Sequence, residues 1–284
     1  MQINDTIFVS TVAFSGKPIE QIINSCKKHK WNLEFSSGLP FREDMSTVYN
    51  NAVLKRMPHN YFPAPEDPFV INLASADRTI LERSIEHCKQ GLKMAKESNS
   101  PFFAAHAGFC IDPNPAELGK KIKYETSFDR EKHKAIFITS VQEILQFAEV
   151  LDIDFLIENN VLAPFNYSDK NPLFCCEYED IQWLFQEIEN KRLGLLLDTA
   201  HLKVSCTTLN KDLHSEFSKL TPYIHALHHS DNDGTHDSND SIAEGYWFLK
   251  FKDQFRNVVQ VLEVKNISED QVEYQLNLLQ NSGT

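Results

Sequence analysis

The sequence lacks a long hydrophobic run: nowhere do about 18 apolar residues follow one another, so no membrane span is predicted. A basic leader is also missing, because the opening residues MQIND carry an acid and no lysine or arginine, and we predict no signal peptide. The six cysteines show no CxxC spacing. Together these absences predict a cytoplasmic protein with reduced thiols, several of them in the core.

An excess of positive charge is missing too. Lysine and arginine number 28 against 40 aspartate and glutamate, which gives a net charge of -12 and a pI near 5.4. This balance disfavours a surface built for nucleic acid or anionic lipid, although it leaves room for a local basic pocket. What is abundant is hydrophobic material, 42% of the chain with 20 phenylalanines, so a large core is expected and wholesale disorder is excluded.

Short apolar runs alternate with amphipathic segments along the chain. The expected strands are Thr6–Phe14, Trp31–Ser36, Val53–Pro58, Pro101–His106, Asp154–Glu158, Leu193–Leu197, Ile224–His228 and Val258–Glu263. The expected helices open with the segment after Pro18 and continue at Asp77–Ser98, Arg130–Val150, Tyr178–Asn190, Lys211–Leu220, Ile242–Phe255 and Glu269–Gln280. This β/α order predicts one α/β domain over residues 1–284, a single (β/α)8 TIM barrel. A doubly wound open sheet is the alternative, weakened by the absence of GxGxxG after the first strand.

Ionisable residues stand at the ends of six expected strands. They are His59, His106, Glu158, Asp198 with His201, His228 and Glu263. In a barrel the carboxyl ends of the strands gather on one face, where the chemistry of this fold occurs. A lone histidine after a strand is usually a hydrogen-bonded core residue, so the argument depends on the whole set.

Three of these residues are acids that follow fully apolar runs, namely Glu158, Asp198 and Glu263. Carboxylates at one barrel mouth repel each other, and a buried carboxylate needs a cation or a raised pKa. A divalent cation removes the repulsion, with His228 completing a mixed nitrogen and oxygen sphere. The alternative is three separately solvated carboxylates at the rim.

The motifs resemble the xylose-isomerase-like TIM-barrel superfamily of sugar isomerases, epimerases and apurinic endonucleases, above all its sugar phosphate isomerase/epimerase proteins. The matching pieces are Glu34 in LEFSSG, His59, HAG at His106, ENN at Glu158, DTAH at Asp198, HHSDNDG at His228, and Glu263. They extend from the second strand to the eighth and so cover essentially the whole chain.

The resemblance implies that Glu158, Asp198, His228 and Glu263 hold the shared divalent metal. Mn or Mg suits the carboxylates, Zn suits the extra histidines, and Co is also open. In the endonuclease branch His59 and His106 would join Glu158 around a second metal. A third metal there uses His201 and an Asp-x-His pair; Asp237 matches, but Asn239 stands where the second histidine belongs, and His236 has no spacing support.

The sequence therefore predicts a metal-dependent sugar or sugar-phosphate isomerase/epimerase. Glu158 and Glu263 would transfer a carbon-bound proton, while His201, Glu34 and His106 would bind the substrate. The alternatives are a metal-dependent phosphodiesterase of the apurinic-endonuclease type and a barrel that only binds a metabolite. A small-molecule sugar or sugar phosphate is the expected partner, with no nucleic acid and no membrane, and the oligomeric state stays open.

Overall fold

The computed structural model describes residues 6–123, 127–168 and 170–280. Its strands form one parallel sheet in the order β3-β2-β1-β8-β7-β6-β5-β4. The strands are β1 (Ile7–Ser10), β2 (Asn32–Phe35), β3 (Arg56–Pro58), β4 (Phe102–His106), β5 (Asp154–Glu158), β6 (Leu193–Asp198), β7 (Ile224–His229) and β8 (Val259–Leu262). The ring closes between β3 and β4, where Asn60 N donates to Ala104 O at 2.9 Å. This is the predicted TIM barrel.

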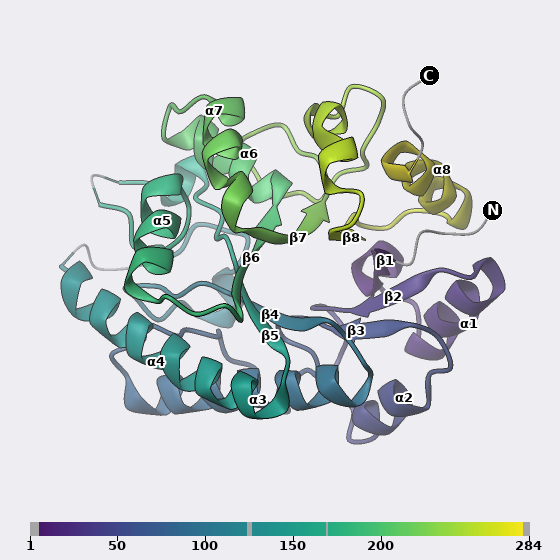
Figure 1. The fold of residues 1–284 in the computed structure, drawn as a ribbon, viewed down its shortest axis with the longest axis horizontal. Helices are drawn as coiled ribbons and strands as arrows, with labels where there is room; N and C mark the ends of the chain where they lie inside the picture. The colour runs from purple at the N-terminus through teal and green to yellow at the C-terminus, as the bar shows by residue number, and fades with distance from the viewer. Residues whose placement is uncertain (1–5, 124–126, 169, 281–284) are drawn as a thin grey trace.

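Helices cover the outside of the strands (Figure 1). They are α1 (Ile19–His29), α2 (Met45–Asn51), α3 (Arg78–Glu97), α4 (Arg130–Leu151), α5 (Tyr178–Glu187), α6 (Thr199–Thr208), α7 (Leu213–Leu220) and α8 (Glu269–Gln280). Side-chain caps fix several of their starts: Asp77, the N-cap of α3, accepts hydrogen bonds from Thr79 N and Ile80 N. In the part of the chain described here, no helix combines the length and the apolar character that crossing a bilayer requires.

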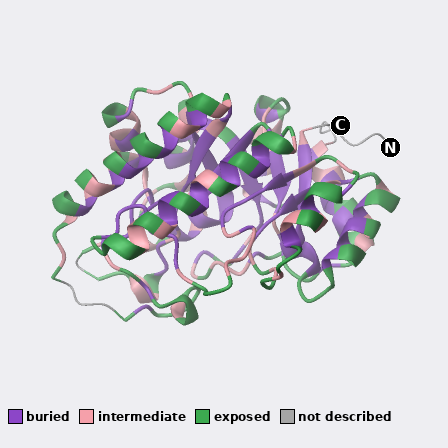
Figure 2. Ribbon diagram, turned by 90° about the horizontal axis from the view of Figure 1, so that it is seen from below, coloured by how far each residue is buried: buried purple, intermediate pink, exposed green. Residues whose placement is uncertain are grey.

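The strands alternate between two buried faces. Figure 2 shows the strands mostly buried, whereas most of the helices present one buried and one exposed side. Outward residues such as Phe155 and Ile157 pack under the helices. Inward residues form a separate cluster that fills the barrel: Phe8, Met57, Phe102, Ala104, Leu156, Leu196, Ala226 and Val261. The interior is thus a packed core, closed below the site.

Three expected segments differ from the structure. The run Thr6–Phe14 is a strand only to Ser10, whose side chain accepts from Val12 N and starts a 3-10 turn at Thr11–Phe14. The expected strand Val53–Pro58 shortens to Arg56–Pro58. The expected helix Ile242–Phe255 is a loop followed by 3-10 turns at Trp247–Phe255. Two helices, α2 and α6, were not predicted.

Candidate metal centre and active-site cavity

The period of two in a strand places the ionisable residues inside the barrel mouth. Each follows a residue of the inner core by two positions, so its side chain points the same way. The pairs are Met57 and His59, Ala104 and His106, Leu156 and Glu158, Leu196 and Asp198, Ala226 and His228, and Val261 and Glu263. Six strands therefore aim a histidine or a carboxylate at one volume.

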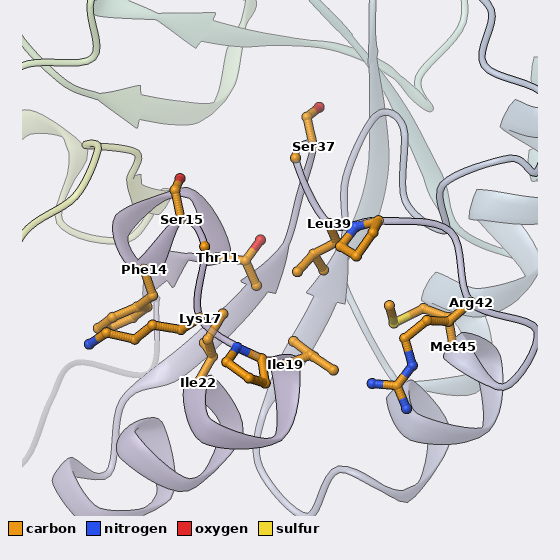
Figure 3. Close-up of a pocket in the computed structure, with 14 residues that line it drawn as sticks. Thr11, Phe14, Ser15, Lys17, Ile19, Ile22, Ser37, Leu39, Arg42 and Met45 are labelled. Atoms are coloured by element: carbon orange, nitrogen blue, oxygen red, sulfur yellow. The ribbon is translucent and has the colours of Figure 1, made fainter.

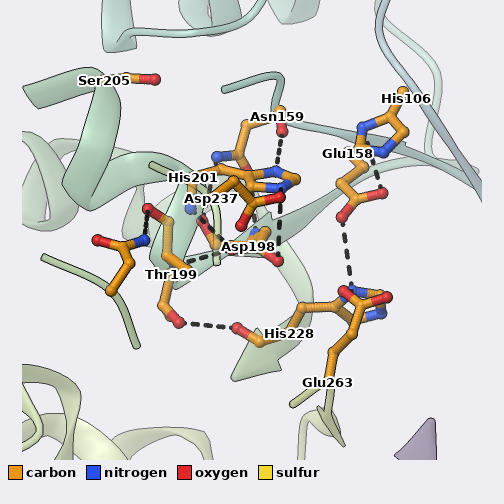
Figure 4. Close-up of polar contacts among 12 residues, drawn as sticks. His106, Glu158, Asn159, Asp198, Thr199, His201, Ser205, His228, Asp237 and Glu263 are labelled. Carbon is orange, nitrogen blue, oxygen red and sulfur yellow. Dashed lines mark hydrogen bonds and ion pairs between the residues drawn. The ribbon is translucent and has the colours of Figure 1, made fainter. Parts of the chain in front are cut away.

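Glu158, Asp198, His228 and Glu263 form the central cluster. One ligand atom from each lies within 4.8 Å of the others. Asp198 and His228 are 0% exposed and Glu158 is 1% exposed. Figure 4 shows the side chains of Glu158, His228 and Glu263 converging from their separate strands. The structure thus brings together all four residues that the sequence predicts as metal ligands.

His228 lies between carboxylates on both sides of its ring. Its Nδ1 is 2.8 Å from Glu263 Oε2 and 3.5 Å from Glu158 Oε1, and its Nε2 is 3.0 Å from Glu34 Oε2. Burial lowers the pKa of His228, but Glu34 and Glu263 outweigh that effect and hold the pKa well above its usual range. With a proton on Nε2 for Glu34, Nδ1 is the nitrogen that faces the cluster, in the manner of carboxylate-supported metal histidines.

The two carboxylate oxygens of Asp198 have different surroundings. Its Oδ1 accepts hydrogen bonds from Ala200 N (2.7 Å) and His201 N (2.8 Å), which caps α6, while its Oδ2 is buried without a hydrogen-bond partner. Asn159 fixes the backbone beside it, since Asp198 N donates to Asn159 Oδ1 at 2.7 Å. Burial raises the pKa of Asp198 to about 7. A free carboxylate oxygen at this depth fits a cation ligand.

The second predicted pair, His59 and His106, lies on the other side of Glu158. Their ring nitrogens Nε2 and Nδ1 are 3.1 and 3.4 Å from Glu158 Oε2. Burial would raise the pKa of Glu158, but the two histidines and His228 hold it well below its usual range. Burial lowers the pKa of His106, against the opposing effect of the Glu158 carboxylate beside it.

His201 stands beside the cluster on α6. Its Nδ1 donates to Asn159 O at 2.8 Å, and its Nε2 is 3.3 Å from Asp237 Oδ2. His201 and His106 line one side of the mouth with ring centroids 5.5 Å apart. Asn239 also lines this volume, but His236 lies on the surface, with a side chain 63% exposed.

These side chains open into a cavity of about 230 Å³, called here the central cavity. Glu158 and Glu263 line it, whereas Asp198 and His228 lie beneath its surface. Glu34 does not line it either and contacts His228 from behind. The rest of the wall is Val12, Ser15, Ser37, Gly38, His59, Asn60, His106, His201, Asp237, Asn239 and Lys265.

A neighbouring cavity of about 370 Å³ lies between the loops that follow β1 and β2 (Figure 3). It meets the central cavity at Ser15, Ser37 and Gly38. Arg42 lines it, but its guanidinium is paired with Glu20 at 2.6 Å and with Asp44 at 2.9 Å. Its charge is therefore already balanced.

Sequence reasoning missed Lys265 as a residue of the mouth. It follows Glu263 by two positions and lines the central cavity, so the same alternation that places Glu263 could have revealed it. His229, next to His228 in the strand, points to the opposite face, where its ring contacts Tyr246 (3.1 Å) and Gln260 (3.0 Å). Burial lowers the pKa of His229 to about 3, so it stays neutral.

The donor set fits a divalent cation. Three carboxylates and one imidazole converge, and two carboxylate oxygens, Glu158 Oε2 and Asp198 Oδ2, are buried without a hydrogen bond. Acids packed this closely repel without positive charge between them. Carboxylate and imidazole donors suit Mn, Zn and similar ions. The fold and the cluster together define an α/β barrel with a histidine and carboxylate centre at its carboxyl-terminal mouth.

The chain belongs to the family described as xylose isomerase-like TIM barrel, whose model matches residues 7–279. Among curated proteins it is similar to a probable endonuclease 4 of Mycoplasmoides gallisepticum, 23% identical over 170 residues, which are 58% of this chain and 48% of that protein. The match thus spans about half the length of that relative.

Solved structures share the whole barrel. A D-tagatose 3-epimerase-like protein superposes with a TM-score of 0.71 at 17% identity, covering 96% of this chain and 97% of its own. The 3-keto-D-glucoside 4-epimerase of E. coli gives 0.66 at 12% identity, with 96% and 97% covered. The TTHB071 protein of Thermus thermophilus, in a soak with ZnCl2, gives 0.66 at 16% identity, with 98% and 100% covered. At these identities the likeness is one of fold.

Proposed function

We propose that the protein is a metal-dependent isomerase or epimerase of a sugar-like hydroxycarbonyl substrate. The main supporting observation is that the four residues of the cluster differ in their access to the central cavity. Glu158 and Glu263 line it, whereas Asp198 and His228 lie below it. Two of the four residues can therefore reach a substrate, and the other two can reach only an ion. Solved barrels named as sugar epimerases support the choice of substrate class.

The two carboxylates do the proton chemistry in this proposal. A divalent cation bound at the cluster would supply Lewis-acid stabilisation of the negative charge that develops on the substrate carbonyl oxygen. Glu158 takes a proton from carbon on one side of the substrate, and Glu263 returns one on the other. The low pKa of Glu158, held down by His59 and His106 against its burial, keeps this carboxylate in the ionised form that binds a cation.

Substrate hydroxyls are held by the histidines of the mouth. His201 is fixed through Nδ1 on Asn159 O, which aims Nε2 at Asp237 and the cavity. His106 faces the same volume from β4. The N–H groups of these rings can donate a hydrogen bond to the oxygen of a sugar hydroxyl. A role for Glu34 in substrate binding stays a prediction, as its contact with His228 favours support of that ring.

The test is solvent deuterium exchange. The Mn²⁺-loaded protein is incubated in D₂O with ketoses and ketose phosphates, and label at the substrate carbon is measured. We expect Glu158→Gln and Glu263→Gln to reduce exchange by well over the roughly 10²–10⁴-fold that follows from loss of a general base, because each change also weakens the metal site. His201→Asn is the matched comparison: metal content stays normal and the effect falls mainly on KM. Near wild-type exchange in both Gln variants would refute the two-carboxylate mechanism.

A phosphodiesterase is the second candidate. The position of His59 and His106 on Glu158 favours it, since these three residues could hold a second ion. The curated relatives named probable endonuclease 4 favour it as well. One observation opposes it. A third metal at His201 and Asp237 would need a further histidine or carboxylate ligand, but the residue beside them in the cavity wall is Asn239.

A further inference from the structure

The central cavity continues into a second space of about 380 Å³, called here the side pocket. The two volumes share the residues of their common boundary: Ser37, Asn60, His106, His201, Asp237 and Lys265. A ligand held at the cluster and by the two histidines would therefore extend into the side pocket. Pockets for drug-sized molecules run from about 300 to 1,000 Å³, so the side pocket alone is large enough for a substantial chemical group.

The wall beyond that boundary is mainly apolar, with Asn160 and Asn166 as its amide side chains. The hydroxyl of Tyr61 accepts a hydrogen bond from Ile71 N at 2.9 Å. The large side chains of the wall are Tyr61, Phe109, Leu118, Ile122, Phe165 and Leu173. Leu118 is 39% exposed, so its side chain is accessible to a ligand in the side pocket. No aspartate, glutamate, lysine or arginine among the described residues lines this part of the wall.

Hydrogen bonds between two loops that follow strands preorganise the side pocket before a ligand binds. Asn166 Oδ1 accepts from Ile122 N at 2.8 Å, and Phe109 pairs with Leu173 in an isolated antiparallel bridge. Behind them, Asn160 Nδ2 donates to Ala107 O and to Phe174 O, each at 3.0 Å. The side-chain amides of these asparagines are hydrogen-bonded to backbone groups. The apolar side chains are therefore the ones that face the side pocket.

We infer that the substrate carries an apolar, ring-shaped substituent that lies in the side pocket, as in a keto-glycoside with an aromatic aglycone. The inference rests on the proposed function, because the sugar part must lie at the cluster. A phosphate would find no cation beyond the boundary residue Lys265. The lysines around Ile122 do not line the pocket, and Lys120 Nζ bonds to Ala116 O at 3.2 Å.

The experiment compares ligands that differ only in the substituent. Methyl and phenyl 3-keto-β-D-glucopyranoside both offer a carbonyl and a neighbouring hydroxyl, and their binding to Mn²⁺-loaded protein is measured by calorimetry. Burial of the phenyl ring should make its Kd at least about tenfold lower than that of the methyl compound. Fructose 6-phosphate should bind no more tightly than fructose at 0.15 M salt.

Variants locate the effect. Leu118→Ser and Phe165→Ala should each reduce the phenyl advantage to below about threefold and leave the methyl Kd unchanged, because the sugar does not contact these residues. Val53→Ser is the matched control, since Val53 is 83% exposed and does not line the pocket. Circular dichroism of each variant confirms that the barrel is folded.

The outcomes separate this inference from the proposed function. Equal binding of the two glycosides, or a phenyl advantage that survives in both pocket variants, overturns the inference even if deuterium exchange occurs. A salt-sensitive preference for the phosphate overturns it as well. The phenyl advantage could instead disappear in Leu118→Ser and Phe165→Ala while no tested substrate exchanges deuterium. That result would support binding of the substituent in the side pocket and refute the proposed proton-transfer function.

Discussion

At the scale of single residues, the site depends on how Glu34 holds His228. Glu34 is 0% exposed, does not line the cavity, and places a carboxylate 3.0 Å from His228 Nε2. It is therefore placed to fix the proton on that nitrogen and turn Nδ1 towards Glu158 and Glu263. A buried charge in this position is costly unless it is paired, which makes an incidental role for Glu34 a poor explanation.

Glu34→Gln should lower metal affinity by about 10–100-fold, as is typical for loss of the group behind a metal histidine. The amide keeps the shape and can still accept a hydrogen bond, but it removes the charge. The measurement is a Mn²⁺ or Zn²⁺ titration by calorimetry. Glu43→Gln, on the exposed loop before α2, is the control. An affinity within threefold of wild type in Glu34→Gln would show that Glu34 does not support the ligand.

Much of the site could be predicted from strand ends alone. Apolar runs that finish in His106, Glu158 or Glu263 identify both the strand and the direction of its last side chain, because alternation is strict in a barrel. Asp237 and the wall of the side pocket could not be placed in this way. They come from loops, whose positions depend on tertiary contacts such as the bond between Asn166 and Ile122.

At the scale of elements, the missed helix α6 has a physical explanation. Seven of its residues are buried, including Thr199, His201 and Ser205, so it lacks the polar stripe by which amphipathic helices are recognised. The opposite error occurs at Ile242–Phe255. There Phe248, Phe251 and Phe255 have helical spacing, yet they pack around Phe217 from a chain of 3-10 turns.

The packing of α3 on β4 allows a test of the fold. A methyl group added at Gly91 would lie 2.3 Å from the ring of Phe103. Helix propensity alone predicts that Gly91→Ala is stabilising, but overpacking costs about 1–3 kcal/mol, so we expect a net loss of stability. Thermal unfolding should show a Tm lower by roughly 5 °C. Gln90→Ala, exposed on the same helix, should be close to wild type, and a raised Tm in Gly91→Ala would contradict the packing described here.

The junction of α8 with α1 predicts a pH effect. Glu269 accepts from Ser25 Oγ (2.7 Å) and Lys28 Nζ (2.9 Å) and contacts His29, and these bonds lower its pKa from 4.5 to about 2. Because the folded-state pKa is depressed, the contribution to stability is present above pH 4.5 and is lost as the pH falls towards 2.

Glu269→Gln should therefore reduce the free energy of unfolding by about 1 kcal/mol at pH 6, a modest value because the side chain is partly exposed. The difference from wild type should shrink as the pH falls through the window from 4.5 to 2. Urea unfolding at pH 6, 4 and 3 measures it. Glu273→Gln, exposed on the same helix, is the control and should show no such pH-dependent difference. A difference that is constant with pH would exclude the ionised carboxylate as its cause.

At the scale of the whole molecule, charge separates the two candidate functions. The net charge is -12, and the loop after β7 adds Asp231, Asp233, Asp237 and Asp240 at the barrel mouth. Binding to a DNA backbone depends on lysine and arginine that displace counterions, and only Lys265 among such residues lines the central cavity in the described part of the chain. An enzyme for small neutral sugars has no need of a basic face.

We therefore expect duplex DNA with an abasic-site analogue to bind no tighter than the non-specific range of about 10⁻⁴–10⁻⁶ M at physiological salt. Fluorescence anisotropy of labelled duplex, with protein loaded with Mn²⁺ or Zn²⁺, measures this at 50 and 200 mM salt. A matched duplex without the abasic site is the control and should bind equally weakly. Sub-micromolar, salt-sensitive affinity for the abasic duplex, with strand cleavage that chelation abolishes, would reverse the order of the two functions. In that case His59 and His106 would be ligands of a second ion on Glu158, and the deuterium test with ketoses should fail.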